Sequence, residues 1–297
     1  MKVLKYAEWR ETCIALHMML QMMGKVKLEA MPPQPEWRHV VLFAEPDGFA
    51  TGLVPSGAGG FEIRLDLSDA CVKTTTASGA SSFSFSGTVS VASLYERFQA
   101  MLVDVGHPCA INPVPQEMFT STPFDEQRES IGFDVLRARR ALRQFLFARN
   151  ALERFSAPYR GKRTLPALYW GTFDMTTTLF SGKPCPYRDN ASLIERAAFD
   201  EQFVEFGFWP GDEDVDDPSF FALAYPFLDH GSSDEVRPRR AFYDPEQMEY
   251  FLRLEDALEA DDPQAAVTRF CQDAFESIAK QQRWNGAARL FEPLLTD

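Results

Sequence analysis

The segment from Phe61 to Leu67 alternates apolar and charged residues without interruption. Its apolar side chains are Phe61, Ile63, Leu65 and Leu67, and the residues between them are Glu62, Arg64 and Asp66. Because successive side chains of a β-strand point to opposite faces, this pattern predicts a strand with one buried and one solvated face. One-sided strands of this kind are typical of antiparallel sheets.

Shorter runs with the same two-residue period surround this segment. One face of a first predicted strand carries Trp37, His39, Val41 and Phe43. Further runs at 72–76 and 83–85 are β-branched or alternate Phe with Ser, and glycine-containing pairs mark turns between the runs. The stretch 37–87 is therefore predicted to be an antiparallel meander.

Apolar residues at three- and four-residue spacing predict helices elsewhere in the chain. The expected helices cover residues 6–23, 91–105, 133–155, 245–260 and 263–284, and Gly24 is expected to end the first. Asp244 and Asp262, each followed by proline, are expected to cap the last two. A second β-rich block is expected at 165–180, 202–209 and 220–228. The predicted fold class is α+β, with antiparallel β-sheets packed by N-terminal, central and C-terminal helices.

The length of 297 residues allows one large domain or two modest ones. The proline-rich stretch 106–124 is the one credible boundary between lobes. Because the first sheet is small for an independent domain, we expect a single compact domain over residues 1–297. Two lobes, 1–112 and 125–297, would share its core.

The chain carries 43 acidic and 30 basic residues, a formal net charge of −13. A field of this sign repels polyphosphates and anionic lipids, so nucleic acids and membrane surfaces are not expected as partners. Six arginines between Arg137 and Arg154 stand out against this balance, and we expect them to pair with carboxylates along an exposed helix face. Phosphate or RNA binding by this helix is the alternative.

The first residues, MKVLKYAEWRE, lack the apolar core of a secretory signal, and the apolar run 13–23 is shorter than the roughly 20 residues of a membrane span. The five cysteines are odd in number, are widely spaced and form no CxxC pair, which argues against a disulfide framework or a zinc knuckle. We therefore expect a cytoplasmic protein with reduced thiols. The oligomeric state does not follow from the sequence.

Sequence motifs for cofactors and metals are missing. No GxxxxGK[ST], GxGxxG, HExxH or GxSxG pattern occurs, and the four histidines show no ligand spacing. The acidic loop 212–217 begins like a calcium loop, but Asp217 and Leu223 occupy the positions of its glycine and its bidentate glutamate. No metal and no cofactor are predicted, and the loop is expected to be a solvated run of charge.

Several polar residues stand where apolar residues would cost less, since a buried polar group needs a partner or a ligand. His17 and Gln21 lie one turn apart on an otherwise apolar helical face, with Lys25 one turn further. His39 stands between Trp37 and Val41 on one predicted strand face. A site would explain each position. The alternative for His17 and Gln21 is a helix edge that touches water or a histidine bonded to a backbone carbonyl, and for His39 it is a hydrogen bond within the core.

Asp174 stands in a predicted strand with polar and aromatic neighbours. One face of that strand carries Trp170, Thr172, Asp174, Thr176 and Thr178. Such a row is either the wall of a pocket or a row facing solvent, and Glu205 repeats the pattern, with exposure or an ion pair as its alternative. The candidate catalytic residues are His17, His39 and Asp174, and the candidate substrate-binding residues are Gln21, Trp170 and Glu205.

Several segments, taken in order, span most of the chain. They are Trp9…Leu16-His17…Gln21…Gly24-Lys25, Trp37-Arg-His39-Val40, Gly161-Lys162, Trp170-Gly-Thr-Phe-Asp-Met-Thr-Thr-Thr-Leu-Phe-Ser-Gly182, Gly207-Phe-Trp-Pro-Gly211 and Ala224-Tyr-Pro226. With these segments the chain resembles the uncharacterised domain-of-unknown-function family 5996. It departs from that pattern at Arg38, where relatives tend to carry tryptophan, and at Leu179, where arginine is usual. If that arginine contacts a ligand, this protein binds the ligand differently or not at all.

The resemblance implies no activity, but its segments contain the flagged residues His17, Gln21, His39, Trp170 and Asp174. We therefore predict that these five side chains line one aromatic-walled cavity for a small polar or zwitterionic molecule. Acid–base catalysis would use a histidine with Asp174, whereas a pure binding module would use the same groups as hydrogen-bond anchors. The alternative is a protein–protein interaction adaptor without catalysis, in which exposed aromatic residues such as Phe208 and Trp209 form the contact patch.

Overall fold

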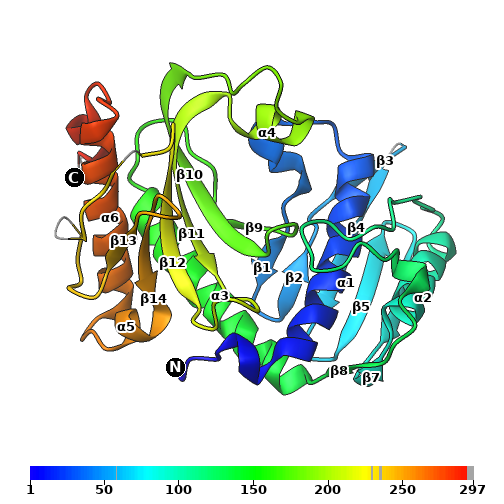
Figure 1. Cartoon of the computed structure of the whole chain (residues 1–297). Coiled ribbons are helices and arrows are strands. Elements are labelled where there is room, and N and C mark those ends of the chain that lie inside the picture. The colour runs from blue at the N-terminus through cyan, green and yellow to red at the C-terminus, as the bar shows by residue number, and fades with distance from the viewer. Residues whose placement is uncertain (58, 229, 234–235, 293–297) are drawn as a thin grey trace, which may run out of the picture. The chain divides into compact units, whose positions relative to one another are not determined.

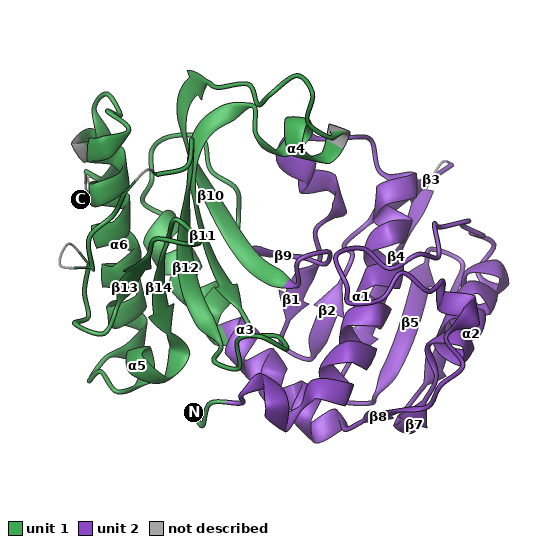
Figure 2. Ribbon diagram, viewed as in Figure 1, with its two compact units in different colours: residues 1–3, 147–166, 174–297 green, residues 4–146, 167–173 purple. Residues whose placement is uncertain are grey.

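The computed structural model describes residues 1–57, 59–228, 230–233 and 236–292 (Figure 1). The chain forms two compact units (Figure 2). Unit 2 consists of residues 4–146 and 167–173, and unit 1 of residues 1–3, 147–166 and 174–297. The boundary between the units falls inside helix α3 (Val135–Ser156). The α+β class with antiparallel sheets is confirmed.

Unit 2 contains the predicted meander. Its strands are β1 (Phe43–Glu45), β2 (Gly48–Ala50), β3 (Val54–Ser56), β4 (Gly59–Asp66), β5 (Cys71–Thr76) and β6 (Gly79–Ser84). They are antiparallel in the order β1-β2-β4-β5-β6, and β3 pairs with β4 outside this order. The alternation that defined the sequence of β4 is confirmed, because Phe61, Ile63 and Leu65 are buried. Strands β7 (Gly87–Val89) and β8 (Ile131–Phe133) form a separate two-stranded sheet.

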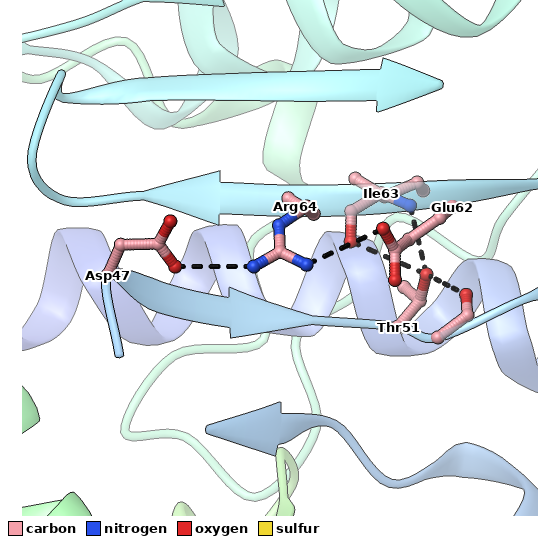
Figure 3. A network of polar contacts seen from close by, with 6 residues as sticks. Asp47, Thr51, Glu62, Ile63 and Arg64 are labelled. Carbon is pink, nitrogen blue, oxygen red and sulfur yellow. Dashed lines mark hydrogen bonds and ion pairs between the residues drawn. The ribbon is translucent and has the colours of Figure 1, made fainter. Parts of the chain in front are cut away.

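Polar contacts tie β4 to its neighbouring segments, through the half-buried side chains of Glu62 and Arg64 and through the buried hydroxyl of Thr51 (Figure 3). The Arg64 guanidinium lies between two carboxylates, 3.3 Å from Asp47 and 3.6 Å from Glu62. The Thr51 hydroxyl accepts a hydrogen bond from the Ile63 N–H at 2.9 Å and donates one to the Gly52 carbonyl at 2.7 Å. These contacts explain why the polar half of the alternation needs no ligand.

Three helices accompany the meander: α1 (Arg10–Ala30), α2 (Val91–Asp104) and α3. The predicted end of the first helix at Gly24 is wrong, because α1 continues for six residues beyond it. Gly24 has a packing role instead: a Cβ at this position would lie 2.0 Å from the Trp170 ring. Leu136, in the first turn of α3, is 65% exposed.

Unit 1 contains the second antiparallel sheet. Its strands are β10 (Asp174–Pro184), β11 (Glu201–Trp209), β12 (Ser219–Tyr225), β13 (Phe242–Asp244) and β14 (Glu249–Arg253), in the order β13-β14-β12-β11-β10. Its helices are α4 (Leu193–Ala198), α5 (Leu254–Leu258) and α6 (Pro263–Gln281), with Asp262 as the predicted N-cap of α6. One sheet face packs on helices: Phe206 contacts Phe155 of α3, and the Tyr250 hydroxyl lies 2.9 Å from the Ser277 hydroxyl of α6.

The predicted helix at 245–260 is wrong, since this segment is the β13–β14 hairpin followed by α5. Asp244 caps a turn instead of a helix, because its carboxylate accepts hydrogen bonds from the N–H groups of Glu246 and Gln247. An aspartate before a proline favours both a helix start and a turn of this kind. The alternating burial of Tyr250 and Leu252 shows that the turn and its strand formed, and not the helix.

Two further predicted strands are interrupted. Residues 35–40 form 3-10 turns with Glu36 and Trp37 in the left-handed region, so His39 lies on no strand. Strand β9 (Ala167–Tyr169) ends before a turn that contains Phe173 at φ 61°, and β10 begins at Asp174. Trp170 and Asp174 therefore do not share a strand face.

A buried carboxylate on α6 gives the first testable expectation. The Asp273 side chain is 2% exposed, accepts hydrogen bonds from the N–H and Nε of Arg237, and pairs with Arg269 Nε at 2.8 Å. We expect Asp273→Asn to lower the free energy of unfolding by about 1–2 kcal/mol in urea titrations, since charge-assisted hydrogen bonds are weakened. The exposed Glu276→Gln on the next turn is the control, and an equal loss in both variants would contradict the expectation.

Candidate functional site

One face of the unit 1 sheet carries two parallel rows of side chains, which we call the acidic face. The strand register places Thr178, Glu205, Leu223, Glu249 and Asp244 side by side in the first row. The second row, two residues further along each strand, holds Thr176, Gly207, Phe221, Phe251 and Phe242. Asp174 lies on the same face at the start of β10 by the two-residue period. Strand alternation thus sets carboxylates directly beside aromatic rings.

The carboxyl groups of the acidic face repel one another. Desolvation, together with the charges of Asp174 and Glu249, raises the pKa of Glu205 to about 8, and a hydrogen bond from Thr178 opposes the shift. Desolvation and the charges of Asp174 and Asp244 raise the pKa of Glu249 to about 7. No basic side chain is among the groups that shift either pKa. The basic residue on this face, Arg253, pairs with Asp217 at 3.6 Å.

The second row adds a polar group that lacks a partner. Among the described residues, none hydrogen bonds with the Thr176 hydroxyl, although Thr176 is 1% exposed. The Phe221 ring lies over the neighbouring Gly207, where a Cβ would come within 2.2 Å of it, and Phe251 stacks on Phe242 with ring centroids 5.7 Å apart. A buried hydroxyl without a partner beside these rings is typical of a position that a ligand completes.

His17 and Gln21 bind main-chain groups within unit 2. The His17 Nε2 lies 2.6 Å from the Trp170 carbonyl, which can only accept, so Nε2 carries the proton. Burial lowers the pKa of His17 to about 4, and hydrogen bonds to Trp170 and Gly171 oppose this shift only partly. The Gln21 amide donates to the Gln116 carbonyl at 2.7 Å and accepts from its N–H at 2.8 Å. Both side chains thus connect α1 to distant segments of the chain by hydrogen bonds to main-chain groups.

Trp170 is held on two sides in unit 2. Its indole N–H donates to the Val40 carbonyl at 3.0 Å, and its ring packs directly on Gly24. Lys25 Nζ lies 5.5 Å from the centroid of the same ring. Trp170 therefore has a defined position beside a basic side chain, but its strand neighbours differ from the predicted ones.

His39 is buried near the same segment. Its Nδ1 accepts a hydrogen bond from the Gln34 N–H at 3.1 Å, so the other nitrogen carries the proton in the neutral ring. Desolvation and the charge of Lys27 lower the pKa of His39. The imidazole also lies beside Trp37, with ring centroids 5.6 Å apart. A local hydrogen bond and a ring contact account for this residue.

The six predicted site residues thus fall into two sets. Unit 2 brings together His17, Gln21 and Trp170 and holds His39 close to Val40, whereas Asp174 and Glu205 lie on the acidic face of unit 1. That all of them line one cavity stays a prediction. Glu249 was not among the predicted site residues because a helix was predicted for residues 245–260. The alternation of apolar and polar residues at 249–253 nevertheless indicates a strand. Phe208 of the predicted adaptor patch is fully buried.

Other features of the described residues give weaker indications of a binding or catalytic site. A surface hollow of about 490 Å³ near Ser84, Ser90 and Arg97 contains none of the predicted residues, and Arg97 donates to the Ser84 carbonyl at its edge. All five cysteines are free thiols. Within the described part of the chain, no group of His, Cys, Asp or Glu side chains is arranged to hold a metal ion. No helix described here has the length and apolarity to span a membrane.

Four of the six arginines of α3 contact carboxylates or main-chain carbonyls of the protein. Arg137 pairs with Asp134 at 3.4 Å and Arg154 with Asp262 at 3.8 Å, while Arg140 lies 3.8 Å from Glu8. Arg139 donates to the carbonyls of Leu67 and Ser68. The contacts of Arg137, Arg140 and Arg154 agree with the expected pairing with carboxylates, whereas Arg139 binds main-chain oxygens.

The fold and the acidic face define an α+β protein with antiparallel sheets and a half-buried cluster of carboxyl groups on one of them. Residues 1–290 match the model of a family of unknown function, DUF5996, and the chain belongs to this family. No curated protein and no solved structure matches the chain. The resemblance stated from the sequence motifs is confirmed, and it adds no activity.

Proposed function

We propose that the acidic face of unit 1 binds a small polar or zwitterionic molecule through a positively charged group. The observation that carries the proposal is that desolvation, together with repulsion from neighbouring carboxylates such as Asp174, raises the pKa of both Glu205 and Glu249. A cationic group placed among them would relieve this repulsion and favour the ionised carboxylates. An organic cation would also interact favourably with the aromatic rings of the second row, because cations bind to ring faces.

The aromatic row and the threonines supply the rest of such a site. Phe221 and Phe251 offer apolar contact, and the Thr176 hydroxyl offers a hydrogen bond to a polar substituent. Glu205, Trp209 and Phe251 are half-buried, so ligand atoms can reach them. For Glu205 and Glu249, no basic side chain is among the groups that shift the pKa, whereas a purely structural pairing would supply one.

Acid–base chemistry is compatible with the same groups. A carboxyl group with a pKa of about 8 is protonated at neutral pH and can donate a proton, as a general acid does. Asp174, on the same face, is the candidate base. The adaptor alternative receives less support, because Phe208 lies on the opposite sheet face from Glu205 and is fully buried.

Matched small molecules test the charge requirement. We expect 1,4-diaminobutane to raise the melting temperature and to bind in calorimetry, while the neutral 1,4-butanediol and the anionic succinate do not. Binding of the diamine should release protons, seen as a dependence of the measured heat on the buffer, because it lowers the raised pKa values. Metabolite profiling of the purified protein then identifies natural ligands among cationic and zwitterionic compounds.

Two variants of β11 locate the binding. We expect Glu205→Gln to weaken diamine binding at least about tenfold, since one charge-assisted contact is lost. Glu201→Gln is the matched control on the same strand, because Glu201 is already paired with Lys162 at 3.2 Å. Equal binding of the diol, or unchanged affinity in Glu205→Gln, would reject the proposal.

A further inference from the structure

Two glutamates of the acidic face stand on either side of one leucine. In the strand register, Leu223 of β12 lies opposite Glu205 of β11 and opposite Glu249 of β14. Directly opposed residues share a sheet face, and neighbouring strands are about 4.8 Å apart, so the Cα atoms of the two glutamates are separated by about 9–10 Å. All three residues are half-buried. The face therefore presents two acidic ends and an apolar centre, each partly exposed to solvent.

Each end offers a further group that can contact an ammonium donor. Glu249 lies opposite Asp244 in the register of β13 and β14. At the other end, Glu205 accepts a hydrogen bond from the Thr178 hydroxyl at 3.4 Å. Thr176 stands on the same face in the next row, and its hydroxyl, in a residue that is 1% exposed, has no partner among the described residues. An ammonium group carries three donors, so one such group can contact both acceptors at either end.

A ligand carboxylate is less well accommodated on this face. The basic residue Arg253 already has an acidic partner, Asp217, at 3.6 Å, and its guanidinium lies 5.8 Å from the Phe242 ring centroid. A zwitterion with one end at Glu205 would place its carboxylate against Glu249, where like charges repel. A molecule with a single cationic group would leave one acidic end without a counter-charge. The arrangement thus favours a ligand that is cationic at both ends.

We propose that the acidic face selects linear diamines, an inference that rests on the cation binding proposed above. One ammonium group binds at Glu205 and Thr176, the other binds at Glu249 and Asp244, and the alkyl chain lies over Leu223. The two charge-assisted contacts reinforce each other, because binding of one end holds the second end close to its own carboxylates. The alkyl chain adds apolar contact with the leucine.

Three ligands with six carbon atoms each test the proposal: 1,6-diaminohexane, hexylamine and 6-aminohexanoate. In calorimetry at pH 7.5 we expect the diamine to bind at least about tenfold more tightly than the other two, because each of these lacks the second cationic group. Equal affinity of hexylamine or of 6-aminohexanoate would overturn the selection of diamines and leave the cation site itself standing. Failure of all three to bind would reject the cation site as well.

Two single variants locate the two ends. Glu205→Gln and Glu249→Gln should each reduce the preference for 1,6-diaminohexane over hexylamine from at least about tenfold to less than about threefold, because one acidic end is lost. The preference is a ratio measured within one variant, so a change in stability does not imitate the effect. The exposed Glu246→Gln, on the same hairpin as Glu249, is the control and should keep the full preference. An unchanged preference in either of the first two variants would contradict the bridging of the two ends.

Discussion

Gly24→Ala is expected to lower the free energy of unfolding by about 3 kcal/mol, although alanine in an exposed helix interior is favoured over glycine by about 1 kcal/mol. The reason is steric. The new Cβ would lie 2.0 Å from the Trp170 ring, and the ring cannot move without losing its hydrogen bond to Val40. Chemical denaturation at neutral pH measures the loss.

A double-mutant cycle identifies the cause of that loss. In a Trp170→Leu background the Cβ has room, so Gly24→Ala should change stability by no more than about 0.5 kcal/mol or should stabilise the helix. Gly79→Ala is the control for a glycine with no heavy atom within 4 Å of the new Cβ. The steric explanation fails if Gly24→Ala costs as much without the indole ring as with it.

Glu205→Gln is expected to stabilise the protein at alkaline pH. The pKa of Glu205 is raised in the folded state, so the folded state binds its proton more tightly than the unfolded state does. Its contribution to stability is therefore present below the unfolded pKa and is lost as pH rises from about 4.5 to about 8. At pH 8.5 we expect the variant to exceed the wild type by about 2–4 kcal/mol, after allowance for partial exposure to water.

The measurement is the difference in unfolding free energy between variant and wild type from pH 4.5 to 8.5. Taking the difference removes the opposite contribution of His17, whose lowered pKa costs stability as pH falls from about 6.5 towards about 4. Glu201→Gln, which removes a paired carboxylate, should lower stability instead. A Glu205→Gln variant that is less stable than the wild type at pH 8.5 would refute the raised pKa of Glu205 in the folded state.

The sequence predicted those helices and strands whose buried side chains follow the regular spacing of apolar residues within the element itself. The alternation of β4 and the capped, amphipathic α6 formed as expected, because their neighbours only need to offer an apolar surface. Segments decided by a distant partner were not predictable in the same way. Gly24 stays helical because Trp170 covers it, and the strand at 249–253 forms because β12 pairs with it.

For the candidate site, polar residues at positions where apolar ones are expected could be picked out from the sequence, because burying a polar group is costly. Their hydrogen-bond partners could not. His17, Gln21, His39 and Asp174 are all buried, as the rule implies. The His17 partner, however, is 153 residues away in the chain, and no spacing in the sequence could name it. The acidic face needed the register of three neighbouring strands, β11, β12 and β14, before Glu205 and Glu249 could be placed in one row.

The seven-residue insertion 167–173 sets an order of events during synthesis. Leu168 pairs with Leu42, while His17, Gly24 and Val40 all contact residue 170. The segment 147–166, which belongs to unit 1, leaves the ribosome before these partners arrive. The side of α1 that receives the indole therefore stays unfilled in the nascent chain. Unit 2 can therefore finish folding only once residues 167–173 have been made, when the first segments of unit 1 have already been translated.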